Sequence, residues 1–289
     1  MIKHLVVFLV SLFALEAAAT DQVILRRVPG IIATPENYTM LVLKEALEAT
    51  IPDYGPYSLK YADREMTRQR TFNEMQIGER VNVADTPVTA GWSEKFIRVP
   101  IPVQRGILSY RLFMVTSKNA DLLAKVETLE DLKKIRQGSG NQWAITRALK
   151  EHKFNIIEAT TKESLLNMLG AGRFDIYGRG INEIFGELSA HSKTHPNIVL
   201  DKHIALYSYL PTYFHVSPNQ GRIAERIDIG LRKINAIGLH EKLFLQHHKN
   251  FINAAALDKR KIFILRSNDE KDEHWKNDLK FLFTTPDMR

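Results

Sequence analysis

Two runs in the middle of the chain alternate between helix and strand patterns, and they limit the possible fold more than any other feature. Residues Glu127–Trp143 predict a short helix, a strand, a Gly-Ser-Gly turn at 138–140 and the start of another helix. Residues Glu163–Tyr177 predict a helix followed by a further strand. Such alternation is typical of α/β layers. The turn offers free backbone N–H groups and a positive helix end to an anion or a polar ligand.

The same alternation begins near the amino-terminal end. Thr34 as N-cap, Pro35 at the first helical position and Glu36 in the first turn favour a helix that runs to about Ala49. Gly78 ends a second predicted helix. The expected elements are a strand at Val23–Val28, the helix from Thr34, a strand at Tyr57–Tyr61, a helix at Arg64–Ile77 and a strand at Arg80–Ala84.

Two extended segments divide this pattern. Residues Ile97–Ile107 contain Pro100 and Pro102 and cannot be helical. Residues Ile204–Val216 are again extended, so two crossings join two α/β lobes as a hinge. The expected domains are residues 22–108 with 213–255 as lobe 1, residues 109–212 as lobe 2, and residues 256–289 as a C-terminal arm.

Four motifs in fixed order carry a resemblance to a known family. They are an apolar strand at Tyr110–Val115, Leu129–Lys133, Gly138–Ser139, and Leu169 with Gly172–Asp175. In this order they resemble the second lobe of the periplasmic solute-binding proteins of extracellular family 3. The resemblance spans roughly residues 23–250. It implies the two-lobed type 2 periplasmic binding protein fold and the capture of a small polar solute for an ABC transporter permease or a membrane sensor.

The first residues have the pattern of a cleavable export signal. Lys3 and His4 precede an apolar stretch at Leu5–Leu15, and Ala17–Ala19 supplies the small residues that signal peptidase requires. A retained anchor is the alternative, but this stretch is too short to span a hydrocarbon core of ~30 Å as a helix. We therefore expect residues 1–19 to be removed and the mature protein to be periplasmic.

The chain has no cysteine. A bacterial lipoprotein needs a cysteine at its first mature position, so this protein is expected to be freely soluble in the periplasm of a Gram-negative cell. Disulfides, cysteine metal sites and cysteine nucleophiles are excluded together.

The net charge of +7 is not concentrated in one segment. Lys and Arg are spread beside nearly as many acids, with no basic run interleaved with aromatic residues, which argues against a nucleic-acid partner. The alternative to bulk charge is an anionic ligand. We expect a monomer.

Ligands of open α/β sheets bind beyond the carboxyl ends of the strands. This rule nominates Asp85 and Thr86 in lobe 1. In lobe 2 it nominates Arg179, with further candidates in the turn at Ser139, Gly140 and Asn141 and in the nearby Trp143.

Each candidate has a structural alternative. Ser139 or Asn141 can cap a helix at 142–150, and Asp85 can stabilise the turn before Pro87. Trp143 is either packing or an aromatic wall. Arg179 can pair with Glu183 or Glu187. Arg70, early on a helix beside Gln69, faces either the cleft or solvent.

The chain departs from the family's amino acid binders at both recognition charges. The family's arginine, which forks onto the ligand α-carboxylate, has its nearest match in Lys95, and a lysine does not reproduce that contact. The family's acidic residue for the α-amino group falls on Gly180. The resemblance therefore keeps the binding role but does not predict a free amino acid as the ligand.

The sequence contains few features that indicate an enzyme. His240, His247 and His248 do not form a His-Glu-x-x-His set, and we read them as surface histidines rather than metal ligands. No Gly-x-Ser-x-Gly elbow, P-loop or dinucleotide fingerprint is present. We expect a protein without enzymatic activity, metal or cofactor. A periplasmic enzyme on the same scaffold, such as a carboxylate-pair glycan hydrolase, stays open as the alternative.

Overall fold

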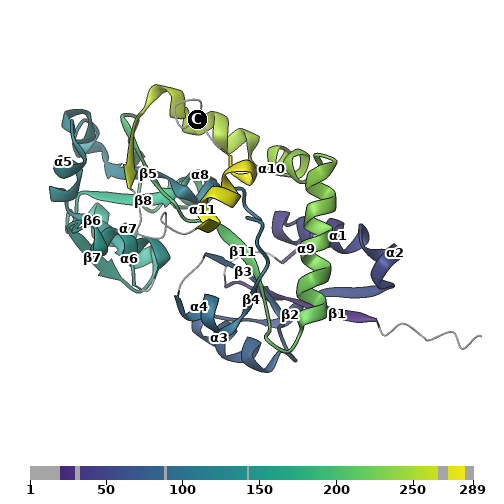
Figure 1. Cartoon of the computed structure of the whole chain (residues 1–289). Coiled ribbons are helices and arrows are strands. Elements are labelled where there is room, and N and C mark those ends of the chain that lie inside the picture. Colours follow the sequence, from purple (N-terminus) through teal and green to yellow (C-terminus); the bar gives the residue numbers. More distant parts are fainter. Residues whose placement is uncertain (1–19, 30–32, 88–89, 142, 266–272, 284–289) are drawn as a thin grey trace, which may run out of the picture.

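The computed structural model describes residues 20–29, 33–87, 90–141, 143–265 and 273–283. The chain folds into two α/β lobes, each built on its own sheet (Figure 1). The predicted export signal, residues 1–19, lies outside the described residues. Within them, no helix is both long enough and apolar enough to cross a membrane.

The lobe 1 sheet has the strand order β2-β1-β3-β11-β4. Strands β1, β2 and β3 are parallel, and β11 runs antiparallel to β3 and β4. Their bounds are β1 Asp21–Arg27, β2 Tyr57–Glu65, β3 Val83–Pro87, β4 Ile97–Arg98 and β11 Thr212–Val216.

Helices cover both faces of this sheet. On one face, α1, α9 and α10 share the main hydrophobic core with Val23, Leu25 and Val83. On the other, α3 and α4 enclose a smaller core around Met75, Trp92 and Phe96. The bounds are α1 Tyr38–Glu48, α2 Ile51–Tyr54, α3 Arg68–Ile77, α4 Ala90–Lys95, α9 Gly221–Ala236 and α10 Leu239–Ala255.

The lobe 2 sheet has the order β12-β10-β5-β8-β6-β7, with β9 also paired to β5. Its strands are β5 Tyr110–Thr116, β6 Gln137–Gly140, β7 Ile156–Ala159, β8 Ile176–Gly180, β9 Ile198–Leu200, β10 Ile204–Ser208 and β12 Lys261–Leu265. Its helices are α5 Leu129–Lys134, α6 Ala144–Glu151, α7 Lys162–Gly170 and α8 Ile181–His191, with 3-10 turns at Ile107–Ser109, Ser117–Asn119 and Leu123–Lys125.

The chain passes between the two sheets three times, and the third passage leads from α10 into the C-terminal arm and β12. The first crossing lies between β4 and β5, and the second joins β10 to β11. These two crossings are bonded to each other, because Val103 N donates to Thr212 O at 2.8 Å and Leu210 N donates to Ser109 Oγ at 3.0 Å. We keep residues 22–108 with 213–255 and residues 109–212 as the proposed extents of the two lobes.

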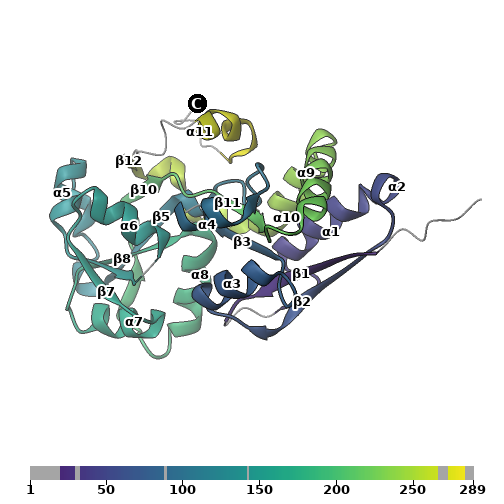
Figure 2. The same cartoon turned by 60° about the horizontal axis from the view of Figure 1, so that its bottom comes forward.

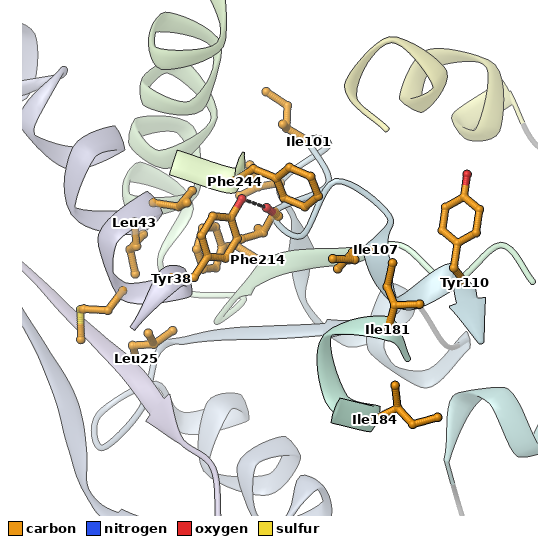
Figure 3. Packing of buried hydrophobic residues seen from close by; sticks show 14 of the residues in the cluster. Leu25, Tyr38, Leu43, Ile101, Ile107, Tyr110, Ile181, Ile184, Phe214 and Phe244 are labelled. Carbon is orange, nitrogen blue, oxygen red and sulfur yellow. Dashed lines mark hydrogen bonds between the residues drawn. The ribbon is translucent and has the colours of Figure 1, made fainter. Parts of the chain in front are cut away.

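One hydrophobic core runs from lobe 1 through the first crossing into lobe 2. Figure 3 shows Leu43 and Tyr38 of α1, Ile101 and Ile107 of the crossing, and Ile181 of α8 in the same cluster. The Tyr38 hydroxyl donates to Val103 O at 2.8 Å, so a lobe 1 helix is fastened to the crossing (Figure 3). The two lobes are therefore packed against each other at the base of the hinge.

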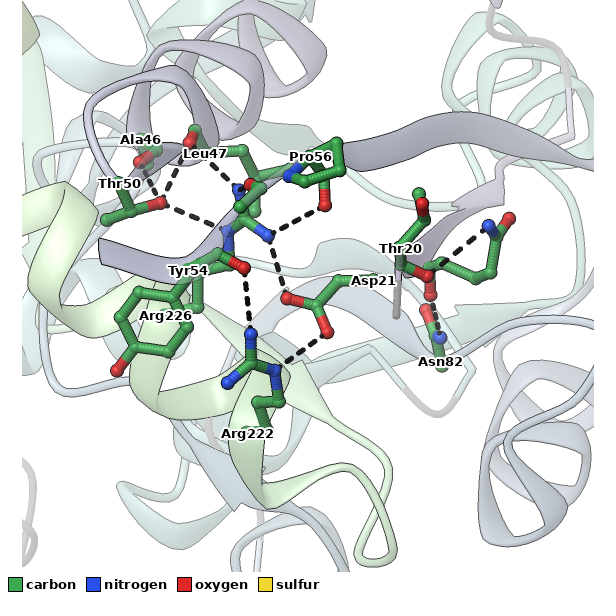
Figure 4. Close-up of polar contacts among 12 residues, drawn as sticks. Thr20, Asp21, Ala46, Leu47, Thr50, Tyr54, Pro56, Asn82, Arg222 and Arg226 are labelled. Atoms are coloured by element: carbon green, nitrogen blue, oxygen red, sulfur yellow. Dashed lines mark hydrogen bonds and ion pairs between the residues drawn. The ribbon is translucent and has the colours of Figure 1, made fainter. Parts of the chain in front are cut away.

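A buried arginine joins several elements of lobe 1 through hydrogen bonds. Arg226 of α9 has no exposed surface and donates to Asp21 Oδ2 at 2.7 Å, to Gly55 O at 2.7 Å and to Thr50 Oγ1 at 3.1 Å (Figure 4). Arg222 donates to the other oxygen of Asp21 at 3.1 Å. These bonds join the first strand, the end of α1 and the turn before β2.

Several element boundaries differ from the sequence prediction. Strand β3 runs Val83–Pro87 rather than Arg80–Ala84, and β1 runs Asp21–Arg27 rather than Val23–Val28. The predicted start at Thr34 is a turn, and α1 begins after Asn37, whose side chain accepts from Thr39 N. Strand β2 runs to Glu65, and α3 begins after Thr67, whose hydroxyl accepts from Arg70 N. The sequence analysis did not predict α4. These caps satisfy the first free N–H groups of their helices, which decides where each helix starts.

The C-terminal arm contributes to lobe 2. Strand β12 pairs in parallel with β10 from Ile204↔Lys261 to Ser208↔Leu265. Helix α11 Glu273–Asp278 and a 3-10 turn at Leu279–Phe281 follow. The predicted polar turn after β12 lies mostly outside the described residues.

Candidate functional site

A cavity of about 210 Å³ lies where the two lobes meet. Strands β1 and β3 contribute Arg26 and Asp85, the first crossing contributes Gln104, and α8 of lobe 2 contributes Asn182. The remaining lining residues are Leu25, Val28, Ala33, Asn37, Tyr38, Thr39, Tyr61 and His248. The cavity thus lies beyond the carboxyl ends of two parallel strands, where sites of α/β sheets form.

A chain of hydrogen bonds forms one wall of this cavity. Gln104 Nε2 donates to Thr39 Oγ1 at 3.0 Å, and Thr39 Oγ1 donates to Asp85 Oδ2 at 3.3 Å. Arg26 Nε donates to Asp85 Oδ1 at 3.1 Å. Asp85 is thus the third residue of β3 rather than the first residue of a loop, and it bonds to Arg26 and Thr39. Its contact with a ligand stays a prediction.

Arg26 retains hydrogen-bonding capacity on the cavity side. Its Nε makes the bond to Asp85, and among the described residues no hydrogen bond to its two Nη atoms is found. A guanidinium can offer such a pair of N–H groups to a carboxylate in forked geometry.

Three lining residues present buried polar atoms without a protein partner among the described residues. They are Gln104 Oε1, Asn182 Oδ1 and both ring nitrogens of His248. A polar atom left buried and unpaired costs about 1–3 kcal/mol. The oxygens and nitrogens of the two amides can exchange places, so these side chains can supply acceptors or donors to a ligand.

Two helix N-termini meet at the cavity. Asn37 and Thr39 lie at the start of α1, and Asn182 is the second residue of α8. The positive ends of both helix dipoles therefore add to the charge of Arg26, and Asp85 offsets part of it. This balance favours a ligand that carries a negative group.

His248 lies inside an aromatic cluster beside the cavity. Its ring is 4.8 Å from the Tyr38 ring and 5.0 Å from the Phe244 ring, measured between centroids. Burial, with a smaller contribution from His247, lowers the pKa of His248 to about 4. The ring is therefore neutral near pH 7 and can either donate or accept one hydrogen bond at each nitrogen.

Arg179 is held by carboxylates of its own lobe. Its Nε and Nη2 lie 2.8 and 2.5 Å from the two oxygens of Glu187, and Nη2 lies 2.9 Å from Glu183 Oε1. Burial disfavours ionisation of Glu183, but Arg179 and Arg111 outweigh it and keep the pKa of Glu183 below its usual value. The alternative pairing named from the sequence is thus present. Contact of Arg179 with a ligand stays a prediction.

Trp143 packs on two of the other candidates. Its indole lies 4.6 Å from the Arg179 guanidinium carbon, and a Cβ at Gly140 would meet the indole at 2.0 Å. Gly140 is therefore a glycine because the ring lies against its backbone. Trp143 also lines a shallow hollow of about 350 Å³ with Asn141 and Arg147.

Neither Ser139 nor Asn141 caps the following helix. Trp143 is the N-cap of α6 and makes no side-chain cap bond. Ser139 is buried, and its hydroxyl lies 2.6 Å from that of Thr146, which in turn donates to Gly140 O at 2.7 Å. The capping alternative is wrong for both residues. The Ser139 hydroxyl contacts Thr146 on the buried side of α6, and Asn141 lines the hollow.

The remaining candidates lie at different places. Thr86 is fully buried and its hydroxyl donates to Pro87 O. Lys95 is exposed in the last turn of α4. Arg70 is half exposed and pairs with Glu74 at 3.7 Å, as the solvated-face alternative expects. None of the three lines the cavity.

Arg68 is a largely buried arginine of α3 whose guanidinium donates to Pro87 O at 3.2 Å. Burial, followed by repulsion from Arg26 and Arg147, lowers the pKa of Arg68 to about 10. Arg68 belongs to lobe 1, and Arg147 lies on α6 of lobe 2.

The three histidines that the sequence analysis weighed as metal ligands, His240, His247 and His248, have different surroundings. His240 is buried, and its Nε2 lies 2.9 Å from Val103 O, so the expectation of a surface histidine is wrong for His240 and for the buried His248. In the described part of the chain, no group of three potential metal ligands is found.

No protein-family model and no curated protein matches the chain by sequence. Solved structures do match. The probable amino-acid ABC transporter extracellular-binding protein ytmK of Bacillus subtilis aligns with a TM-score of 0.57 and 14% identity, over 79% of this chain and 97% of its own. The chain has the type 2 periplasmic binding protein fold. The predicted α/β, two-lobed architecture is confirmed.

Two further neighbours carry bound ligands. The substrate-binding protein AbpA of Streptococcus pneumoniae, bound to L-arginine, has a TM-score of 0.55 and 14% identity over 80% of this chain and 96% of its own. An ancestral arginine-binding protein bound to glutamine has a TM-score of 0.55 and 14% identity over 78% and 97%. These neighbours are substrate-binding proteins.

Of the lining residues, the strand-end rule nominated only Asp85, and those that sequence reasoning missed include Arg26, Gln104, Asn182 and His248. Arg26 is the penultimate residue of β1, so the strand-end rule that nominated Asp85 extends to it. Asn182 lies two residues after Gly180, the position of the missing acidic residue. Gln104 and His248 come from a crossing and from the side of a helix, and no sequence signal marks them.

Proposed function

We propose that this protein is a solute-binding protein that captures a small polar solute in the cavity between its lobes. The observation that carries the proposal is the set of unpartnered polar atoms of Gln104, Asn182 and His248, which come from the crossing, lobe 2 and lobe 1 and converge on one cavity. A ligand that bonds to groups of both lobes favours the arrangement in which the lobes are together.

The cavity indicates the chemistry of the ligand. Its volume of about 210 Å³ is smaller than that of most drug-sized sites, which suits a metabolite of a few heavy atoms. Arg26 and the two helix N-termini favour a carboxylate.

The neighbours support an amino acid-like solute in general. Two of them are bound to arginine and to glutamine. In this chain the family's arginine and acidic residue are replaced, and we propose that Arg26 takes the carboxylate in place of Lys95. Asp85 is available for a cationic group of the ligand once Arg26 turns toward the carboxylate.

We further propose that the protein is exported, that residues 1–19 are its signal, and that it works with an ABC transporter permease or a membrane sensor. The neighbours named as transporter components support such a partner. A Gram-negative periplasm and a monomeric state remain predictions from the sequence.

A thermal-shift screen of the purified mature protein against polar metabolites tests the proposal. A true ligand at 100 times its dissociation constant adds about 2.7 kcal/mol to the free energy of unfolding. Mass spectrometry then examines the ligand after incubation. Recovery of an unchanged carboxylate solute supports a binder. Steady conversion of the solute shows the enzyme alternative, and the absence of any stabilising carboxylate contradicts the proposed chemistry.

A further inference from the structure

The C-terminal arm contacts both crossings between the lobes. Its strand β12 belongs to the lobe 2 sheet, while its last described residues lie against the crossings and against α10. Figure 1 shows the yellow segment around α11 between the two lobes, and Figure 2 shows it above β11. The arm therefore joins elements that would move relative to each other if the lobes rotate.

Asp278 fastens the arm to the second crossing. Its side chain is buried, and its Oδ2 accepts hydrogen bonds from the hydroxyls of Tyr209 and Tyr213. These tyrosines flank the Leu210-Pro211-Thr212 segment through which the chain returns to lobe 1. One carboxylate thus spans the second crossing from one end to the other.

Leu282 and Phe283 fasten the arm to the first crossing. Phe283 N donates to Arg105 O at 2.7 Å, and a Cβ at Gly106 would meet Leu282 Cδ2 at 2.9 Å. The Phe283 ring lies 5.6 Å from Tyr110 at the start of β5 and 6.0 Å from Phe244 of α10.

The backbone at this contact has an uncommon conformation. Arg105 and Gly106 are consecutive left-handed residues, with φ of 45° and 75°. A non-glycine residue rarely adopts positive φ, and hinge motion is absorbed by a few residues that change φ and ψ. The arm therefore binds the crossing at the residues best placed to act as the pivot.

We propose that the C-terminal arm is a strap that restrains rotation of the lobes by holding both crossings in one conformation. Asp278 clamps the second crossing, Leu282 and Phe283 clamp the first, and β12 anchors the strap in lobe 2. The hinge of this protein is accordingly stiffer than two extended segments alone would make it.

Spin labels measure lobe separation directly, and the absence of native cysteines allows specific labelling. Cysteines at Gln76 on α3 and Glu163 on α7, both exposed, place one label on each lobe. Pulsed electron resonance then gives the distance distribution in the full chain without ligand. Asp278→Ala and Phe283→Ala are compared with Lys280→Ala, which alters an exposed residue of the same arm.

Hydrogen exchange gives a second readout at the crossings. Removal of Asp278 should raise the exchange rate of the Val103 and Leu210 amides by about tenfold or more, since each hydrogen bond to a charged group is strong. Amides in β8 should not change. This contrast separates a loosened hinge from a general loss of stability.

The strap predicts broader label distances and faster crossing exchange in Asp278→Ala and Phe283→Ala, with Lys280→Ala like the parent. If Asp278→Ala does not fold, Tyr209→Phe and Tyr213→Phe carry the same test, because each removes only one hydroxyl. Unchanged distances and unchanged exchange in the folded variants would overturn the proposal. The test uses no ligand, so its outcome is independent of the proposed function.

Discussion

Arg179 and Glu187 form a forked ion pair at the end of β8, with atom separations of 2.8 and 2.5 Å and side chains 4% and 13% exposed. Lys162 lies 3.5 Å from the same carboxylate. A strand-end arginine that the sequence rule nominates for a ligand is thus already paired on α8. The pair orients the helix that carries Asn182 to the cavity.

Arg179→Ala should lower the free energy of unfolding by about 3 kcal/mol, because it leaves a buried carboxylate without its partner. Arg136→Ala is the matched control, since Arg136 makes the same fork on Asp175 at 2.9 and 2.8 Å at the surface. Denaturant melts should show a much smaller change for the control. Equal losses in the two variants would contradict the structural role of Arg179.

Gly140→Ala should displace the Trp143 indole, because the new methyl carbon would lie 2.0 Å from the ring. We expect a loss of about 1–3 kcal/mol, typical of overpacking, with a shift in tryptophan fluorescence. Gly186→Ala on α8 meets nothing within 4 Å and should instead stabilise its helix by up to about 1 kcal/mol. A neutral Gly140→Ala would show that the ring does not need the glycine.

The fold could be predicted from periodicity and punctuation because those signals are local. Pro100 and Pro102 marked the first crossing, and Gly78 ended α3 as expected. Helix starts were less predictable, because Thr34-Pro35-Glu36 has the composition of a start while Asn37 makes the cap bond. When several possible cap residues lie close together in the sequence, the backbone geometry decides which of them caps the helix.

The site could be predicted only near the strand ends. The strand-end rule nominated Asp85, which is the third residue of β3, and it extends to Arg26, the penultimate residue of β1. His248 and Gln104 were beyond reach, because their place at the cavity depends on how α10 and the first crossing pack against α1. The role of Gly140 depends likewise on a ring three residues away.

Stability should fall as the pH decreases from about 6.5 to 4. Burial lowers the pKa of His215, His240 and His248 to about 4 each, from 6.5 in the unfolded chain. Between these values the unfolded state binds more protons, so protonation favours unfolding. Each histidine accounts for up to about 3 kcal/mol, present above pH 6.5 and lost by pH 4.

Urea melts of His240→Gln between pH 4 and 7 check this origin. The variant should show a shallower loss of stability on acidification than the parent, while His152→Gln, at the end of α6 and only partly buried, should follow the parent. An identical pH slope in parent and His240→Gln would contradict the assignment to buried histidines.

Binding of the solute at the cavity between the lobes is tested most directly by calorimetric titration. The carboxylate solute that stabilises the protein in the thermal-shift screen is titrated into the parent, Arg26→Gln and Arg70→Gln. Both changes replace an arginine with glutamine, but only Arg26 lines the cavity. The account predicts an affinity at least about tenfold weaker for Arg26→Gln, because a charge-assisted fork is lost, and an unchanged affinity for Arg70→Gln. Parent-like affinity in Arg26→Gln would contradict the placement of the solute between the lobes at this cavity.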